Sequence, residues 1–252
     1  MSTSDGTETP FKQKFFVPLE NNPEVFGTLA RHLGVAEELG FYDVYSLDDP
    51  DLLSHIPRPV YALIFICPSV VYYAARREEN DHMAEYASHG ETEPVFWVKQ
   101  TIGNACGLYG LLHAISNGPA RKHILPGSEL ESLLKEAILL EPKARADIIY
   151  HSQALEEAHQ KAAVLGDTEA PPAEEEPDGH FICFVKGDDG RLWELNGGMK
   201  GPVDRGTLAP EMDALSEEAI QLGVGDFLSV AKEAGIEDVA FSIVAVAPKH
   251  GE

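Results

Sequence analysis

The stretch Gln100-Thr-Ile-Gly-Asn-Ala-Cys106-Gly-Leu-Tyr-Gly-Leu-Leu-His113 constrains this 252-residue chain more than any other. Gly103 and Asn104 predict a turn, and a helix follows it. The apolar residues of that helix recur at helical spacing: Leu108, Leu111, Leu112 and Ile115. Such spacing is typical of a helix buried in a core. It places Cys106 in the first turn, where backbone N–H groups lack partners within the helix.

Cys106 is a candidate nucleophile because of this position. The positive end of the helix dipole favours a thiolate, so we expect the pKa of Cys106 to be lowered. Gln100 lies six residues upstream, and its side-chain amide could return to the same place. Together with the Cys106 N–H it would supply the two donors that an oxyanion hole needs. The alternative is that Cys106 is a small buried hydrophobic residue, as most free cysteines are.

A thiolate nucleophile works with a histidine and with a third group that orients the histidine. His113 is about two helical turns, ~10 Å, beyond Cys106 and cannot reach it directly. His180 opens an apolar strand directly after a flexible loop, and Asn196 ends the second strand of the same hairpin. Antiparallel pairing therefore brings His180 beside Asn196, whose side-chain oxygen can accept from a histidine N–H. The alternatives are a strand-end histidine exposed by chance and an ordinary Asn-Gly turn.

Periodicity and capping signals place most helices early in the chain and most strands late. Besides the helix at Cys106, helices are expected over about 23–32, 50–53, 69–86, 128–141, 142–151 and 210–233, the last interrupted near 223–225. Strands are expected over about 15–18, 41–45, 60–67, 180–185, 191–195 and 239–247, with 197–205 irregular. This order predicts an α+β class or a mixed three-layer arrangement.

Residues 152–178 differ in composition from the rest of the chain. They hold eight acidic residues, one lysine and three prolines, so we expect them to bury too little apolar surface to become ordered. The part 154–165 is expected to be transiently helical, and the whole stretch to be a loop within one domain. Residues 1–10 are expected to be mobile. Four histidines in polar stretches are expected to face solvent: His82, His89, His123 and His159.

The formal net charge of the chain is −23, from 42 acidic and 19 basic residues. Binding of nucleic acid needs clustered Lys and Arg, so a nucleic-acid partner is not expected. A basic protein surface or a basic peptide tail fits this charge better. The alternative is that the charge only keeps the protein soluble.

The three cysteines, Cys67, Cys106 and Cys183, are too few and too scattered for a disulfide framework. No CxxC or HExxH motif is present, so we expect neither a metal site nor a cofactor. The longest apolar run, Val60–Cys67, has eight residues and is too short to cross a bilayer. The first ten residues lack a hydrophobic signal core. We expect a monomer in the cytoplasm, in reducing surroundings and away from membranes.

The segment Lys99–Gly107, with the following Leu111 and His113-Ala-Ile115, resembles the active-site signature of the ubiquitin carboxyl-terminal hydrolases. Further segments are similar to the same family: Pro18–Glu20, Asn22–Val25, Asp43–Tyr45, Pro57–Val60, His180–Ile182 and Glu194–Gly197. The resemblance extends from about Phe15 to the final strand. It implies one catalytic domain over residues 11–252.

This resemblance implies a papain-like cysteine protease, with a central antiparallel sheet between helical layers and a knotted chain. Cys106 would be the nucleophile, Gln100 the oxyanion donor and His180 the general base. Residues 152–178 would be the family's crossover loop, which drapes over the active-site cleft. The implied reaction is hydrolysis of amides, esters or thioesters at the C-terminal glycine of ubiquitin, or of a ubiquitin-like protein, through an acyl-thioester.

The chain departs from the family pattern at Asn196, where the family has Asp. The following Gly198–Gly201 also differ from the usual pattern. One alternative is therefore a non-catalytic or weakly active ubiquitin-binding module. Another is a papain-like hydrolase or acyltransferase of different specificity, although the papain signature C-G-[SA]-C-[WY] is absent.

Overall fold

The computed structural model describes residues 13–167, 171–175, 177–236 and 241–249. In these ranges the chain forms a six-stranded sheet in the order β1-β6-β2-β3-β4-β5, and every neighbouring pair is antiparallel. The strands are β1 (Leu39–Asp43), β2 (Ala62–Pro68), β3 (Gly179–Lys186), β4 (Arg191–Leu195), β5 (Val203–Thr207) and β6 (Ser242–Pro248).

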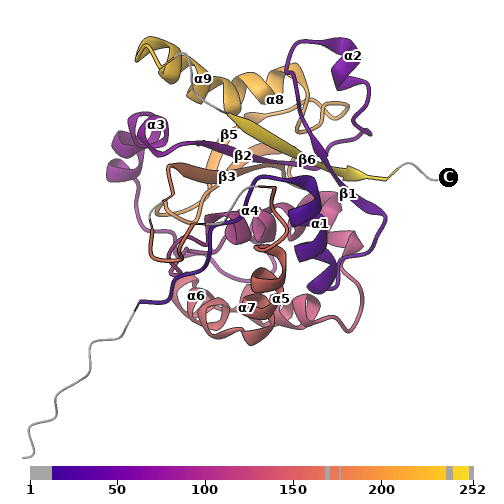
Figure 1. The fold of residues 1–252 in the computed structure, drawn as a ribbon, viewed down its shortest axis with the longest axis vertical. Helices are drawn as coiled ribbons and strands as arrows, with labels where there is room; N and C mark the ends of the chain where they lie inside the picture. Colours follow the sequence, from indigo (N-terminus) through magenta and orange to yellow (C-terminus); the bar gives the residue numbers. More distant parts are fainter. Residues whose placement is uncertain (1–12, 168–170, 176, 237–240, 250–252) are drawn as a thin grey trace, which may run out of the picture.

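Helices cover both faces of the sheet. Figure 1 shows α3, α8 and α9 on one face, and α1 with α4 to α7 on the other. The helices are α1 (Pro23–His32), α2 (Pro50–Leu53), α3 (Ser69–His82), α4 (Cys106–Ile115), α5 (Glu129–Leu139), α6 (Pro142–His151), α7 (Gln153–Ala162), α8 (Glu217–Leu222) and α9 (Val224–Glu233), with a 3-10 helix over Gly118–His123. No helix in the described ranges has the length and apolarity that a bilayer span requires.

The apolar run predicted as a central strand supplies side chains to both layers. In β2, Ala62 and Ile64 belong to the core under α1 and α4, whereas Leu63, Phe65 and Cys67 belong to the core under α3 and α9. A strand that is covered on both faces reads as a continuous apolar run rather than as an alternation. The predicted α+β class with three layers is confirmed, while the knotted path of the chain stays a prediction.

Local capping signals give helix starts correctly. Asn22 caps α1 through its side-chain oxygen, which accepts from Glu24 N, and Asp49 caps α2 in the same way. Ser128 caps α5 by accepting from Glu131 N. The expected break near residues 223–225 is the boundary between α8 and α9 at Gly223.

The strand expected over residues 15–18 is wrong. Phe15 makes only an isolated bridge to Gly103. Phe16 N–H donates to Gly103 O at 2.9 Å, and Gly103 N–H donates to Lys14 O at 2.8 Å. The two segments meet at this single crossing, where Phe16 is buried and Phe15 is exposed, so the apolar pair does not indicate sheet pairing.

The irregular segment expected over 197–205 is also wrong, because it contains the start of β5. The sequence Val203-Asp-Arg-Gly-Thr207 has no apolar alternation, and β5 is an edge strand that pairs only with β4. Other element boundaries differ as well: β1 spans 39–43 rather than 41–45, β2 begins at Ala62 rather than 60, α3 ends at His82 instead of 86, and the helix expected from 210 begins at Glu217. The strand expected from 239 is β6, and positions 239 and 240 lie outside the described residues.

The first part of residues 152–178, expected to be only transiently helical over 154–165, is an ordered helix. Residues Gln153–Ala162 form α7, and Ser152 caps it by accepting from Leu155 N. Helix α7 carries many charged residues, but one of its sides is buried and the helix packs against α1. The buried residues recur at helical spacing: Leu155, Ala158, His159 and Ala162.

His159 is therefore not solvent-facing as expected, but only 1% exposed. Its Nε2 lies 2.7 Å from Val17 O, and burial lowers its pKa to about 4. Residues 1–10, expected to be mobile, lie outside the described residues.

Candidate active site

The turn before α4 brings Cys106 to a cavity. Asn104 has a φ of 56°, in the left-handed region, which reverses the chain before the helix. Helix α4 then begins at Cys106, and all ten of its residues are buried. The cavity has a volume of about 390 Å³, and its walls include Gln100, Cys106 and His180. The structure thus brings three of the four predicted site residues to one space.

The fourth predicted residue, Asn196, contacts His180 as the hairpin geometry predicts. Strand β3 pairs with β4 so that Cys183 lies opposite Leu195, which places the end of β4 near the start of β3. His180 Nε2 lies 3.0 Å from Asn196 Oδ1. Asn196 is only 1% exposed, so this contact forms away from bulk water.

Gly198 fixes the orientation of the Asn196 carboxamide. The Gly198 N–H donates to Asn196 Oδ1 at 2.8 Å, so this atom must be the acceptor oxygen rather than the NH₂ group. His180 Nε2 must then carry the hydrogen that it shares with the same oxygen. The neutral imidazole is left with an unprotonated Nδ1, which can act as a base.

Gln100 is held against the residues that follow β4. Its backbone N–H donates to Gly197 O at 2.9 Å, and its side-chain Nε2 donates to Ile102 O at 3.0 Å. A Cβ at Gly197 would lie 2.7 Å from the Gln100 Cβ, so only glycine permits this approach. The neighbouring Trp97 Nε1 donates to Asn196 O at 3.0 Å, which ties the segment that carries Gln100 to the residue that contacts His180.

Burial dominates the ionisation of Cys106 and His180. It raises the pKa of the Cys106 thiol, although backbone N–H groups of Phe181, Gly107 and Cys106 act in the opposite direction. It lowers the pKa of His180, against the effect of the bond to Asn196. The predicted lowering of the cysteine pKa is therefore wrong, because desolvation outweighs the helix N-terminus. Both shifts favour a neutral thiol and a neutral imidazole over an ion pair.

Comparison with known proteins decides the family. Residues 16–228 match the sequence model of a family described as ubiquitin carboxyl-terminal hydrolase, family 1. The chain belongs to the ubiquitin carboxyl-terminal hydrolase family. The members of this family are thiol-dependent cysteine peptidases, and the chain is an enzyme of that class.

Individual relatives agree with this family. Ubiquitin carboxyl-terminal hydrolase 3 of Arabidopsis thaliana is 38% identical over 198 residues, which cover 78% of this chain and 82% of that protein. Ubiquitin carboxyl-terminal hydrolase YUH1 of Saccharomyces cerevisiae is 32% identical over 240 residues, covering 92% and 95%. The fold resembles the UCH37 catalytic domain of Trichinella spiralis bound to ubiquitin vinyl methyl ester, with a TM-score of 0.69 at 19% identity over 95% of this chain and 97% of that one. The papain-like arrangement is thereby confirmed.

One residue at the site of this hydrolase was missed from the sequence. The ring of Tyr72, on α3, stacks on the imidazole of His180 with a centroid distance of 4.0 Å and an interplanar angle of 23°. Tyr72 lies in the run Val71-Tyr-Tyr73, which reads only as a helix with an apolar side. More than one hundred residues separate it from His180, so no local pattern could have paired them.

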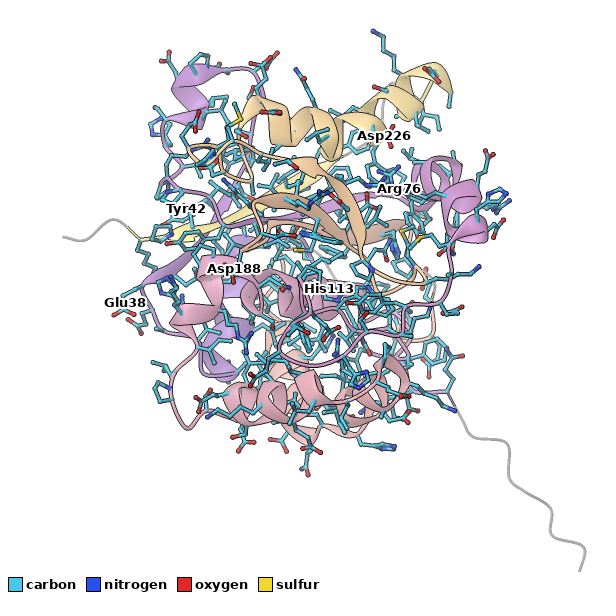
Figure 2. The ribbon with its side chains drawn as sticks, turned by 180° about the vertical axis from the view of Figure 1, so that it is seen from behind. Glu38, Tyr42, Arg76, His113, Asp188 and Asp226 are labelled. Atoms are coloured by element: carbon cyan, nitrogen blue, oxygen red, sulfur yellow. The ribbon has the colours of Figure 1, made fainter. Side chains whose placement is uncertain are left out.

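A buried ion-pair network joins α3 to the strand that leads to Asn196. Glu194, in β4, is fully buried, and its two carboxylate oxygens lie 2.9 and 3.0 Å from Arg76 Nε. Arg205 Nε donates to the same carboxylate at 2.8 Å. Figure 2 shows Arg76 and Asp226 side by side between α3 and α9, where they also form an ion pair. The network holds α3, β4, β5 and α9 together beside the site.

His113 has a structural contact, in agreement with its predicted distance from Cys106. It is fully buried in α4 (Figure 2), and its Nε2 accepts from Val98 N–H at 3.2 Å. Burial lowers its pKa to about 3, so it stays neutral in the folded protein. Among the residues described, no group of three or more His, Cys, Asp or Glu side chains is placed to hold a metal ion.

Proposed function

We propose that the protein is a deubiquitinating hydrolase that cleaves small adducts or peptides from the C-terminal glycine of ubiquitin or of a ubiquitin-like protein. The observation that carries the proposal is the bond between His180 Nε2 and Asn196 Oδ1, beside a cavity that His180 shares with Cys106. The names of the relatives, and the ubiquitin bound to the structural neighbour, support ubiquitin as the partner.

In the proposed acylation, the Cys106 sulfur attacks the carbonyl carbon of the terminal glycine. The thiol proton passes to His180 Nδ1, which the Asn196 bond leaves unprotonated. The imidazolium then gives that proton to the departing amine, alcohol or thiol as its bond to the carbonyl breaks. The products of this half-reaction are the leaving group and a thioester between Cys106 and ubiquitin.

In the proposed deacylation, His180 takes a proton from water as the water oxygen attacks the thioester. The Cys106 sulfur leaves, regains a proton, and ubiquitin departs with a free carboxylate. Each step passes through an oxyanion, for which the Cys106 N–H and the Gln100 side-chain amide are the proposed donors. One N–H of that amide is bonded to Ile102 O, and the other, which has no hydrogen bond to the described part of the chain, is the proposed donor.

The segment between α7 and β3 is the proposed crossover loop, and its described part lies at the cavity. Asn104 Nδ2 donates to Ala173 O at 2.8 Å and to Glu175 O at 2.7 Å. Pro177 and Asp178 form part of the cavity wall. A segment tied down beside the nucleophile favours small or extended leaving groups over folded ones. The remaining expectations, a cytoplasmic monomer that binds neither nucleic acid nor membranes, stay predictions.

Hydrolysis of a fluorogenic amide at the C-terminus of ubiquitin tests the proposal. The parent should turn this substrate over, and Cys106→Ala should abolish turnover while ubiquitin binding persists. Cys183→Ala is the matched control, since Cys183 is fully buried in β3 and should leave the rate almost unchanged. Substantial activity in Cys106→Ala would sink the assignment of the nucleophile.

A ubiquitin that carries a C-terminal electrophile separates the alternatives. Covalent capture through Cys106 supports the hydrolase. Binding without capture would identify a ubiquitin-binding module, and neither outcome would point to another substrate.

A further inference from the structure

The proposed base has an aromatic neighbour that holds the plane of its ring. Tyr72 is 6% exposed, and its ring lies nearly parallel to the His180 imidazole at a centroid distance of 4.0 Å. Such a stack restricts rotation of the imidazole about its side-chain bonds. The ring of His180 is thus fixed by Asn196 at one edge and by Tyr72 across one face.

The backbone of Gly198 shows that these three side chains converge. A Cβ built on Gly198 would lie 3.1 Å from Asn196 Oδ1, 3.4 Å from Tyr72 Oη and 3.6 Å from His180 Cε1. The phenol oxygen of Tyr72 is therefore next to both the carboxamide and the imidazole. The hydroxyl, and not only the ring, belongs to this cluster.

The carboxamide needs a neighbour of this kind. Asn196 Oδ1 accepts from both His180 and Gly198, whereas Asn196 Nδ2 is buried without an acceptor at full hydrogen-bond geometry among the described residues. Burial raises the pKa of Tyr72 to about 12, and the Asn196 amide acts in the opposite direction, as an N–H that faces the phenol oxygen would. A carboxylate at position 196 would carry no N–H, and its second oxygen would instead accept from the Tyr72 hydroxyl, so the hydroxyl would change from acceptor to donor.

We infer that Tyr72 is a positioning residue for the proposed reaction: its ring and hydroxyl keep His180 and Asn196 in the arrangement that leaves His180 Nδ1 unprotonated. This inference rests on the proposed function. The ion pair between Arg76 and Glu194 supports it, since Arg76 follows Tyr72 by one turn of α3, and Glu194 in β4 lies two residues before Asn196, which directly follows that strand. The buried ion pair between Arg76 and Glu194, which lies outside the site, thus holds the helix of Tyr72 at a fixed distance from Asn196.

The test combines kinetics with a measurement that needs no turnover. Tyr72→Leu should lower kcat by about three- to tenfold, the range that a stacked aromatic pair contributes, with KM nearly unchanged. Nitrogen-15 NMR of His180 should show a smaller fraction of the tautomer protonated at Nε2. Tyr72→Phe keeps the stacked ring and should lower kcat by less than Tyr72→Leu does. Tyr45→Leu is the control, because Tyr45 is 79% exposed and lies outside the cluster.

Asn196→Asp gives the decisive comparison. Since the Tyr72 hydroxyl accepts from the amide in the parent but would have to donate to a carboxylate, the loss of activity caused by Tyr72→Phe should differ between the parent and the Asn196→Asp background. Equal losses in both backgrounds, or a Tyr72→Leu protein with the parent's tautomer fraction, would overturn the inference. If Tyr72→Leu does not fold, the Tyr72→Phe comparison still decides. If the parent protein shows no turnover, the proposed function is contradicted. The tautomer fraction of His180 in Tyr72→Leu would still test whether Tyr72 positions the imidazole.

Discussion

His180 and Asn196 meet across 3.0 Å at the same end of a β-hairpin, and the oxygen of Asn196 also accepts from Gly198 N–H. In a serine triad, replacing Asp by Asn costs ~10⁴ in rate because the amide can hold the neutral imidazole in the wrong tautomer. Here the second bond turns the amide oxygen toward the ring. For the proposed reaction we therefore expect a smaller penalty, which comes from the missing charge of the carboxylate.

Asn196→Asp should move the acid limb of the pH profile of kcat/KM. The pKa of His180 is lowered by burial, so the neutral base persists to low pH. A carboxylate beside the imidazolium stabilises the charged form and raises this pKa, so the acid limb should shift to higher pH. Rates of ubiquitin-amide hydrolysis across pH measure the shift.

A shift confined to the alkaline limb would instead indicate a thiolate–imidazolium resting pair, because the imidazolium would then ionise last. Asn196→Ala should lose activity at every pH. Equality with the parent throughout would remove Asn196 from the mechanism. Intact mass must be checked first, since Asn-Gly pairs deamidate.

His159 should make the fold sensitive to acid. Its folded pKa of about 4 lies below the ordinary value of 6.5, so the unfolded chain binds the proton first as pH falls. The contribution of neutral His159 is complete above pH ~6.5 and should decline by up to about 3 kcal/mol as the pH falls to ~4. His159→Gln cannot become charged, and it should flatten the dependence of the urea-unfolding free energy on pH. His82→Gln, an exposed site on α3, should leave the slope unchanged.

Glu194→Leu should destabilise the protein strongly. It would leave Arg76, which is 2% exposed, without the carboxylate that binds its Nε, and would also remove a partner of Arg205. Breaking a buried pair in this way costs about 3–5 kcal/mol, measurable by denaturant unfolding. Glu78→Leu, an exposed change on α3, should stay within about 0.5 kcal/mol. Similar effects for the two variants would show that the network contributes little.

Association with ubiquitin should slow as salt rises. The net charge of −23 favours a basic partner surface, and exposed charges are screened over ~30 Å at 0.01 M salt but only ~8 Å at 0.15 M. The association rate of Cys106→Ala with ubiquitin should therefore fall several-fold over this range, with a smaller change in dissociation. A constant association rate would argue against electrostatic steering.

Local rules predict the parts of this molecule that are decided locally. The helices capped by Asn22, Asp49 and Ser128 begin within about a residue of their expected starts, because a cap needs only its own first turn. The hairpin that joins His180 to Asn196 follows from the separation of its strands along the chain. These rules predict the contact between His180 and Asn196, whereas the meeting of Cys106, Gln100 and His180 at one cavity was implied by the family resemblance.

Local rules could not predict contacts between segments that are distant along the chain. Tyr72 reaches His180 only because α3 packs over β3, and His159 is buried only because α7 packs on α1. The prediction of a lowered pKa for Cys106 was wrong for the same reason. The sequence reveals the helix N-terminus that lowers it, whereas the burial that raises it depends on everything packed around the thiol.

The end of helix α7 limits the length of the proposed crossover loop. With α7 ending at Ala162 and β3 beginning at Gly179, only residues 163–178 remain between two packed elements. Sixteen residues span at most about 55 Å when fully extended, so an arch made from them has two sides of about 27 Å each. A globule of about 75 residues has a radius of gyration near 11 Å and measures roughly 28 Å across. We therefore expect the proposed loop to hinder the passage of a folded domain of this size.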